Sequence, residues 1–327
     1  MTTPAVDSGP TASHAALSDD VITRNLQGRL AMTLSIRPID PVSRPFFGGE
    51  ASGIDITQPL TREQASEIEK GMDEFGVMVF HDQRFTDDAQ VAFSRNFGEL
   101  ELATNNLRDT KEQRLGAHIA DISNLDANNN VLARENRRRL FSLGTRLWHS
   151  DSSFKVVPAK YSLLSARIIP DKGGNTEFAD MRAAYDTLDD ETKAQCEGLV
   201  CEHSQLFSRA QIGFGDFTEE ERRQFAPVQQ RLIRRHPSTG RKSLYLASHA
   251  GTIVGWPIPE ARAFLRDLVE HATQRQFVYS HQWKQFDLVI WDNRATMHRS
   301  RPFDATQVRD MHRTTVAALR STMAEAV

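Results

Sequence analysis

The sequence predicts a mainly β fold with helical insertions, of the β-sandwich or jelly-roll kind. Short runs rich in β-branched and aromatic residues dominate the middle of the 327-residue chain. Helical patterns lie near its start and in insertions between the strands, and no internal repeat is visible. Strands grouped in this way favour sheets that pack on one another in one domain, with helices added at the periphery.

The first 31 residues are expected to lie outside that domain. They are polar and small and show no periodicity, so we expect residues 1–31 to form a disordered tail. Met32 opens a segment with a strand pattern at 34–38. We therefore expect one folded domain at residues 32–327.

Two helices and a buried strand are predicted at the start of the domain. Thr61 is a typical N-cap residue for a helix that ends near Glu74, and Thr86 caps a second helix. Between them, residues 76–80 form a run typical of a buried strand. Further strands are expected at 117–123, 161–169, 232–235, 244–247, 278–282, 288–291 and 313–318. Further helices are expected at 181–188, 190–199, 218–225 and 259–273.

Composition argues for a soluble protein without nucleic-acid or membrane partners. The net charge is only −3, so no overall field favours binding to nucleic acid or to a membrane. No apolar stretch approaches the roughly 20 residues that a membrane helix needs, and the N-terminus has no apolar signal core. The two cysteines, Cys196 and Cys201, are not expected to form a disulfide, which favours a cytoplasmic location.

One short motif carries most of the chemistry. His149 and Asp151 are separated by one residue, and side chains at i and i+2 of a strand point to the same face. The two side chains could therefore hold one metal ion from a single strand, and the distant His298 could add a third ligand. Two histidines and one carboxylate, with positions left open, are typical of non-haem Fe(II) oxygenases.

Three further features support this metal site. Residues 173–178 form a double-glycine turn that leads into a strand and carries Thr176, whose hydroxyl can donate to a carboxylate. Residues 292–294 form a turn that positions His298. Arg309 and Arg313 follow four residues apart, and their guanidinium groups suit carboxylates. Two such groups near a metal predict two carboxylate ligands, one on a cosubstrate and one on a substrate.

The chain resembles the taurine dioxygenase/2,4-dichlorophenoxyacetate dioxygenase family of Fe(II)/2-oxoglutarate-dependent enzymes. Within this family it is most similar to the 2,4-dichlorophenoxyacetate dioxygenase branch. The matching stretches span about residues 33–320 and comprise 93–98, 120–124, 147–154, 173–188, 240–242, 270–275 and 291–299. The resemblance implies a double-stranded β-helix (jelly roll) fold, often in a homo-oligomer.

The resemblance also implies the role of each site residue. It makes His149, Asp151 and His298 the iron ligands, and it assigns Thr176 and Arg309 to the distal carboxylate of 2-oxoglutarate. Arg313 would hold the substrate carboxylate. Fe(II), 2-oxoglutarate and O2 are the implied cofactor and cosubstrates, and ascorbate is expected to help in vitro. The implied reaction hydroxylates a small anionic aromatic substrate, an aryloxyacetate such as 2,4-dichlorophenoxyacetate, in herbicide degradation, and gives a phenol, glyoxylate, succinate and CO2.

The chain departs from this branch around the expected substrate. Asn106 and Asn130 stand where the phenoxyacetate enzyme carries lysines thought to face the substrate, and Thr145 replaces an asparagine. His203, His236 and His249 match histidines of the branch, and we expect His236, His249 and Asn106 to line the substrate pocket.

These departures leave other functions open. The same mechanism could act on a sulfonate, a sulfate ester or another carboxylate. A non-catalytic sensor that binds a metal and 2-oxoglutarate, and more remotely a zinc hydrolase, would use the same ligands.

Overall fold

The computed structural model describes residues 1–2, 33–103 and 114–325. The chain divides into a unit at Met1–Thr33 and a compact unit at Leu34–Val327. Residues 3–31 of the predicted tail, and the predicted substrate residue Asn106, lie outside the described residues. The compact unit is mainly β with helical insertions, as the sequence predicts.

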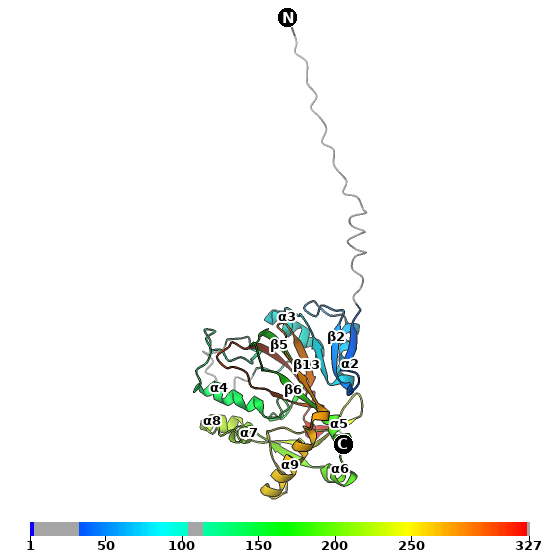
Figure 1. Ribbon diagram of the computed structural model, residues 1–327, viewed down its shortest axis with the longest axis vertical. Helices are drawn as coiled ribbons and strands as arrows, with labels where there is room; N and C mark the ends of the chain where they lie inside the picture. Colours follow the sequence, from blue (N-terminus) through cyan, green and yellow to red (C-terminus); the bar gives the residue numbers. More distant parts are fainter. Residues whose placement is uncertain (3–32, 104–113, 326–327) are drawn as a thin grey trace. The chain divides into compact units, whose positions relative to one another are not determined.

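Four sheets make up the described part of the compact unit. The largest has seven strands in the order β1-β2-β3-β13-β5-β15-β4, and Figure 1 shows β5 and β13 side by side within it. The others have the orders β12-β6-β14, β11-β7-β8 and β10-β9. The strands are β1 Ser35–Asp40, β2 Arg44–Ser52, β3 Val77–Phe80, β4 Ala120–Asp121, β5 Ala159–Ile168, β6 Thr176–Asp180, β7 Val200–His203, β8 Val228–Arg231, β9 Ile233–Arg235, β10 Lys242–Leu244, β11 Ala250–Ile253, β12 Val278–His281, β13 Leu288–Asp292, β14 Thr296–Ser300 and β15 Asp310–Ala317.

The helices connect and cover these strands. Thr61 caps α2 with a capping box, in which its side chain accepts from the Gln64 N–H and the Gln64 side chain accepts in return. Thr86 caps α3, as predicted, and its side chain accepts from the Ala89 N–H. The α-helices are α2 Arg62–Phe75, α3 Asp87–Ser94, α4 Arg137–Ser142, α5 Met181–Asp186, α6 Asp190–Cys196, α7 Gln205–Ala210, α8 Glu219–Gln224 and α9 Ile258–Ala272.

Successive side chains along the central strands point to opposite faces of the large sheet, and apolar side chains lie on both faces. Leu288 and Ile290 of β13 pack in a cluster with residues of α2 and α3, whereas Val289 and Trp291 point to the opposite face. There Trp291 meets Phe178 of β6, with ring centroids 5.5 Å apart. The sheet β12-β6-β14 therefore packs against the large sheet, and the space between them is the interior of the molecule.

The same alternation decides which polar side chains face that interior. On β6, Ala179 packs with α9 on the outer face, so Thr176 and Phe178 point inward. On β14, Met297 packs outward, and His298, paired with Phe178, points inward. On β15, Met311 lies in the interior cluster, and Arg313 follows two residues later. Three predicted site residues therefore come from strands that face one interior space.

Several predicted elements need correction. The strand predicted at 117–123 is reduced to the two residues of β4, and the strand predicted at 244–247 lies at β10, two residues earlier. The helix predicted at 190–199 ends earlier, at Cys196 of α6, and Cys201 lies in β7; both cysteines are buried free thiols. No described helix has the length and hydropathy needed to cross a membrane.

Candidate metal centre and its two cavities

His149 and His298 face each other across a pair of backbone hydrogen bonds. The His149 N–H donates to the His298 carbonyl at 3.0 Å, and the His298 N–H donates back at 2.8 Å. His149 therefore forms an isolated bridge to β14, while Asp151 lies in the turn that follows. The expectation that His149 and Asp151 share a strand is wrong, because His149 forms only an isolated bridge and the turn already begins at Asp151.

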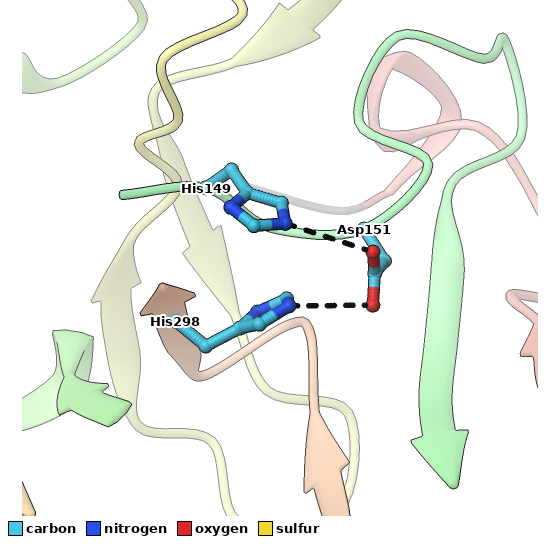
Figure 2. Close-up of side chains that lie close together, drawn as sticks. All are labelled: His149, Asp151 and His298. Carbon is cyan, nitrogen blue, oxygen red and sulfur yellow. Dashed lines mark ion pairs between the residues drawn. The ribbon is translucent and has the colours of Figure 1, made fainter. Parts of the chain in front are cut away.

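The turn nevertheless brings three ligand atoms together. Asp151 Oδ1 lies 3.9 Å from His149 Nε2, and Asp151 Oδ2 lies 3.6 Å from His298 Nε2 (Figure 2). All three side chains are buried, and their ligand atoms lie within 4.8 Å of one another. Two imidazole nitrogens and one carboxylate at this spacing fit a divalent transition metal such as Fe(II).

Hydrogen bonding and protonation prepare His149 for a metal. Its Nδ1 lies 2.8 Å from the Leu147 carbonyl, which can only accept, so Nδ1 carries the proton and Nε2 keeps a free lone pair. Burial lowers the pKa of His149, and burial together with the charge of His149 lowers that of His298 well below its usual value. Both imidazoles are neutral near pH 7, as metal binding requires.

Asp151 is held as a carboxylate by several donors. Burial alone would raise its pKa, but the charge of Arg313 keeps the pKa well below the usual range. The Ser162 hydroxyl donates to Oδ2 at 2.7 Å, and Arg313 Nη1 donates to Oδ1 at 2.5 Å. Asn293 accepts from the Asp151 N–H and donates to Ser162. No local pattern in the sequence indicates a role for Ser162, because its contact with Asp151 is formed only in the folded chain.

One cavity of about 160 Å³ opens beside His298 and contains the predicted cosubstrate residues. Its walls include Thr176, Arg309 and Arg313, with Trp291 and Phe303 as apolar surface. Thr176 is buried and its hydroxyl accepts from the indole N–H of Trp283 at 3.0 Å. The cavity therefore brings Thr176 and Arg309 together next to a metal ligand, although they are 133 positions apart in the sequence.

Arg309 is an unusual buried cation. Only 7% of its surface is exposed, and within the described residues its guanidinium makes one hydrogen bond, in which Nη1 donates to the Ile122 carbonyl at 3.2 Å. No described carboxylate pairs with it, and burial lowers the pKa of its guanidinium to about 10. A buried charge without a partner is costly, so this geometry suits an anionic ligand in the cavity.

A second cavity of about 160 Å³ adjoins the first and shares His149 and Arg313 with it. Asp151 and His249 line it, together with the aromatic rings of Phe141 and Phe154. The His249 ring lies 4.9 Å from that of Phe154, and its Nδ1 is 2.9 Å from the Ser153 hydroxyl. This cavity is thus aromatic on one side and polar beside the metal ligands, and neither phenylalanine was predicted.

Other predicted residues lie elsewhere. His236 does not line either cavity, because its Nε2 lies 3.0 Å from Asp292 and its Nδ1 accepts from the Thr239 N–H. The predicted substrate contact of His236 is therefore not supported by its position. Asn130 is exposed and bonded to Asp126, also away from both cavities, whereas Thr145 lines both of them.

Comparison with known proteins identifies the family. The model of the taurine catabolism dioxygenase TauD/TfdA family matches residues 35–315. The chain belongs to this family. A 2,4-dichlorophenoxyacetate dioxygenase of Cupriavidus pinatubonensis, dependent on α-ketoglutarate, is 43% identical over 83% of this chain and 94% of its own length. The (S)-phenoxypropionate/α-ketoglutarate dioxygenase of Sphingobium herbicidovorans is 33% identical over 88% of this chain and 96% of its own length.

A solved structure agrees with these relatives. The crystal structure of AAD-2 in complex with Mn(II) and N-oxalylglycine is 55% identical, has a TM-score of 0.85 and covers 89% of this chain and all of that one. The TauD/TfdA member described here is an Fe(II)- and 2-oxoglutarate-dependent dioxygenase, which confirms the resemblance drawn from the sequence. Membership of this family argues against the alternatives of a non-catalytic sensor and a zinc hydrolase.

Proposed function

We propose that this dioxygenase hydroxylates an aryloxyacetate of the 2,4-dichlorophenoxyacetate type beside the ether oxygen. The unstable hemiacetal then collapses, so that substrate, 2-oxoglutarate and O2 yield a phenol, glyoxylate, succinate and CO2. The observation that carries this proposal is the second cavity, which combines aromatic walls with the Arg313 guanidinium beside the metal ligands. Relatives named for phenoxy acids, at 43% and 33% identity, support the same substrate class.

His149, Asp151 and His298 are the proposed Fe(II) ligands. Bound iron with 2-oxoglutarate and O2 would supply the oxidising chemistry. The chain's own part is to hold two neutral imidazoles and one carboxylate in place, through the Leu147 carbonyl and the Ser162 hydroxyl. His298→Ala should lower the affinity for Mn(II) at least tenfold by calorimetry, since it removes one of three ligands. Unchanged Mn(II) affinity would refute the ligand assignment.

Thr176 and Arg309 are the proposed partners of the distal 2-oxoglutarate carboxylate. Arg309 offers a buried guanidinium that pairs with no described carboxylate. Thr176, at the start of β6 in the sheet β12-β6-β14, offers a hydroxyl proton. Charge-assisted bonds of this kind are stronger than neutral ones, because the cavity excludes most of the competing water.

Arg313 and His249 are the proposed contacts of the substrate. Arg313 lines both cavities; its Nη1 donates to Asp151, and its Nε is buried without a partner among the described residues. Its remaining donors can take the substrate carboxylate and so place the carbon next to it beside the metal. His249 would contact the ether or the ring, while Phe141 and Phe154 would pack against the ring. Asn106 stays a predicted contact.

We also propose a double-stranded β-helix fold, a single catalytic domain and a homo-oligomeric state for this protein. The packing of β12-β6-β14 on the large sheet supports a double-stranded β-helix, and a catalytic domain at 32–327 accommodates the family match at 35–315. We expect a homo-oligomer in the cytoplasm, where both cysteines stay reduced as they are here. Light scattering of the purified protein tests the oligomer.

The proposed reaction is tested with a substrate panel. We expect Fe(II)-, 2-oxoglutarate- and ascorbate-supplemented enzyme to release succinate in step with phenol from aryloxyacetates. The panel includes alkyl sulfates and sulfonates, because an alkylsulfatase of Acinetobacter baylyi is 27% identical over 83% of this chain and guanidinium groups also bind sulfate. Faster succinate release with a sulfate ester than with any aryloxyacetate would refute the proposed substrate class.

A further inference from the structure

Trp283 donates a hydrogen bond to the Thr176 hydroxyl. The Trp283 Nε1 atom lies 3.0 Å from Thr176 Oγ1. An indole N–H can only donate, so Thr176 must be the acceptor, and its own hydroxyl proton is left for another partner. Within the described residues no acceptor takes that proton, although the side chain is only 3% exposed. The proton is therefore available to a ligand in the first cavity, which Thr176 lines.

We propose that Trp283 is a positioning residue for 2-oxoglutarate, and that it acts through the Thr176 hydroxyl on the distal carboxylate. This inference rests on the role proposed above for Thr176. Trp283 itself does not line the cavity, so it would act without touching the cosubstrate.

The strand register explains how Trp283 reaches Thr176. His281, the last residue of β12, pairs directly with Thr176, the first residue of β6. Trp283 lies two residues beyond His281, where the chain has left the sheet, and its ring packs edge-on against the His281 ring at 4.7 Å and 90°. The indole is thus held above the end of β6 by its neighbour in sequence.

A buried carboxylate fixes the turn that carries Trp283. Asp287 is fully buried and accepts from His281 Nε2 at 3.0 Å and from the Lys284 N–H at 2.8 Å. A second histidine, His81, lies 2.6 Å from its other oxygen. The residues on both sides of Trp283 are therefore tied to one rigid group, so the indole is held in place although it is only half-buried.

This arrangement affects affinity in two ways. Threonine has a choice of side-chain rotamers, and the indole hydrogen bond selects the one that presents its hydroxyl to the cavity. A donor into the oxygen also polarises the O–H bond and makes the hydroxyl a better donor. Losing one neutral hydrogen bond in such a chain should weaken 2-oxoglutarate binding about three- to tenfold.

The test compares two 2-oxo acids on Mn(II)-loaded, anaerobic protein by calorimetry. In Trp283→Phe, the Kd for 2-oxoglutarate should rise about three- to tenfold. The Kd for 2-oxobutyrate, which lacks the distal carboxylate, should change by less than about twofold, as should the Kd of Mn(II). Trp256→Phe is the matched control, because Trp256 is also half-buried but packs against the core cluster that contains residues of α9, whereas Trp283 packs against another cluster.

A double-mutant cycle separates action through Thr176 from general loosening. In a Thr176→Val background, Trp283→Phe should have no further effect on 2-oxoglutarate affinity, since the hydroxyl is already gone. Additive effects of the two substitutions, or equal losses for both 2-oxo acids, would overturn the inference. Trp283→Met, which also lacks a donor, replaces the phenylalanine variant if that protein does not fold. If wild-type protein does not bind 2-oxoglutarate, the proposed cosubstrate site fails instead.

Discussion

Replacing Arg309 with methionine should weaken 2-oxoglutarate binding without destabilising the protein. Burial lowers the pKa of this guanidinium to about 10 from its usual value above 12. At about 1.4 kcal/mol for each pH unit, the lowering corresponds to roughly 3 kcal/mol of lost solvation. Removing the hydrogen bond to the Ile122 carbonyl costs about 1 kcal/mol in return. The free energy of unfolding of the ligand-free variant should therefore stay level or rise by up to about 2 kcal/mol.

Cosubstrate affinity should move in the opposite direction. A charge-assisted contact with a carboxylate contributes about 2–3 kcal/mol, so the Kd for 2-oxoglutarate should rise roughly 30- to 150-fold. Denaturant unfolding and anaerobic calorimetry measure the two quantities on the same preparation. Arg266→Met is the control, because Arg266 is exposed and paired with Asp267. An Arg309→Met protein that is less stable by more than about 1 kcal/mol and binds 2-oxoglutarate normally would show that Arg309 is structural.

The remaining predictions concern pH, backbone strain and ligand linkage. Burial alone would lower the pKa of His312, but its contacts with Asp310 and Asp87 raise it. Its protonated form therefore stabilises the fold below its unfolded value of 6.5, and this contribution disappears as the pH rises through the folded pKa. His312→Gln should thus lower the midpoint of urea unfolding at about pH 6 and have little effect at about pH 9; an equal loss at both values would contradict this. Gly173 has a φ of +77°, and a β-carbon there would collide with the Pro302 carbonyl oxygen. Gly173→Ala should therefore lower the free energy of unfolding by about 2–3 kcal/mol. Gly174→Ala has a similar φ but ordinary contacts and should cost less, and the reverse order would be inconsistent with the geometry. Mn(II)-loaded protein with 2-oxoglutarate at 100 times its Kd should gain about 3 kcal/mol of stability, measured as a higher Tm that falls back on chelation of the metal. An unchanged Tm would argue against a ligand site in the folded protein.

Local signals in the sequence were sufficient for elements that stabilise themselves. The α2 helix begins where Thr61 and Gln64 form a capping box, and both residues are neighbours in the sequence. The β14 strand was not predicted, since Thr296–Ser300 lacks a continuous apolar pattern and is held by pairing with β6. Its identity as a strand depends on a partner more than 100 residues away, which no local pattern reveals.

In the candidate site, too, some residues could be predicted from local sequence and others depend on the folded structure. Residue types and spacing were enough to nominate His149, Asp151 and His298, because metal chemistry restricts the ligand set severely. The substrate cavity was less accessible to prediction. Phe141 and Phe154 reach it from α4 and from the turn after Asp151, and an isolated phenylalanine in a sequence is most often part of a core. His236 illustrates the converse error, since a histidine that matches the branch is used here to bind Asp292.

The division of the site into two cavities has a consequence for laboratory evolution. The walls unique to the second cavity, such as Phe141, Phe154 and His249, do not touch the first, which contains Thr176 and Arg309. A mutagenesis library confined to Phe141, Phe154 and His249 can therefore search for new substrates while the metal ligands and the cosubstrate contacts stay intact; Asp151, which also lines only the second cavity, is a metal ligand and is left out. His149 and Arg313 belong to both cavities, and they mark the positions that such a library must leave alone.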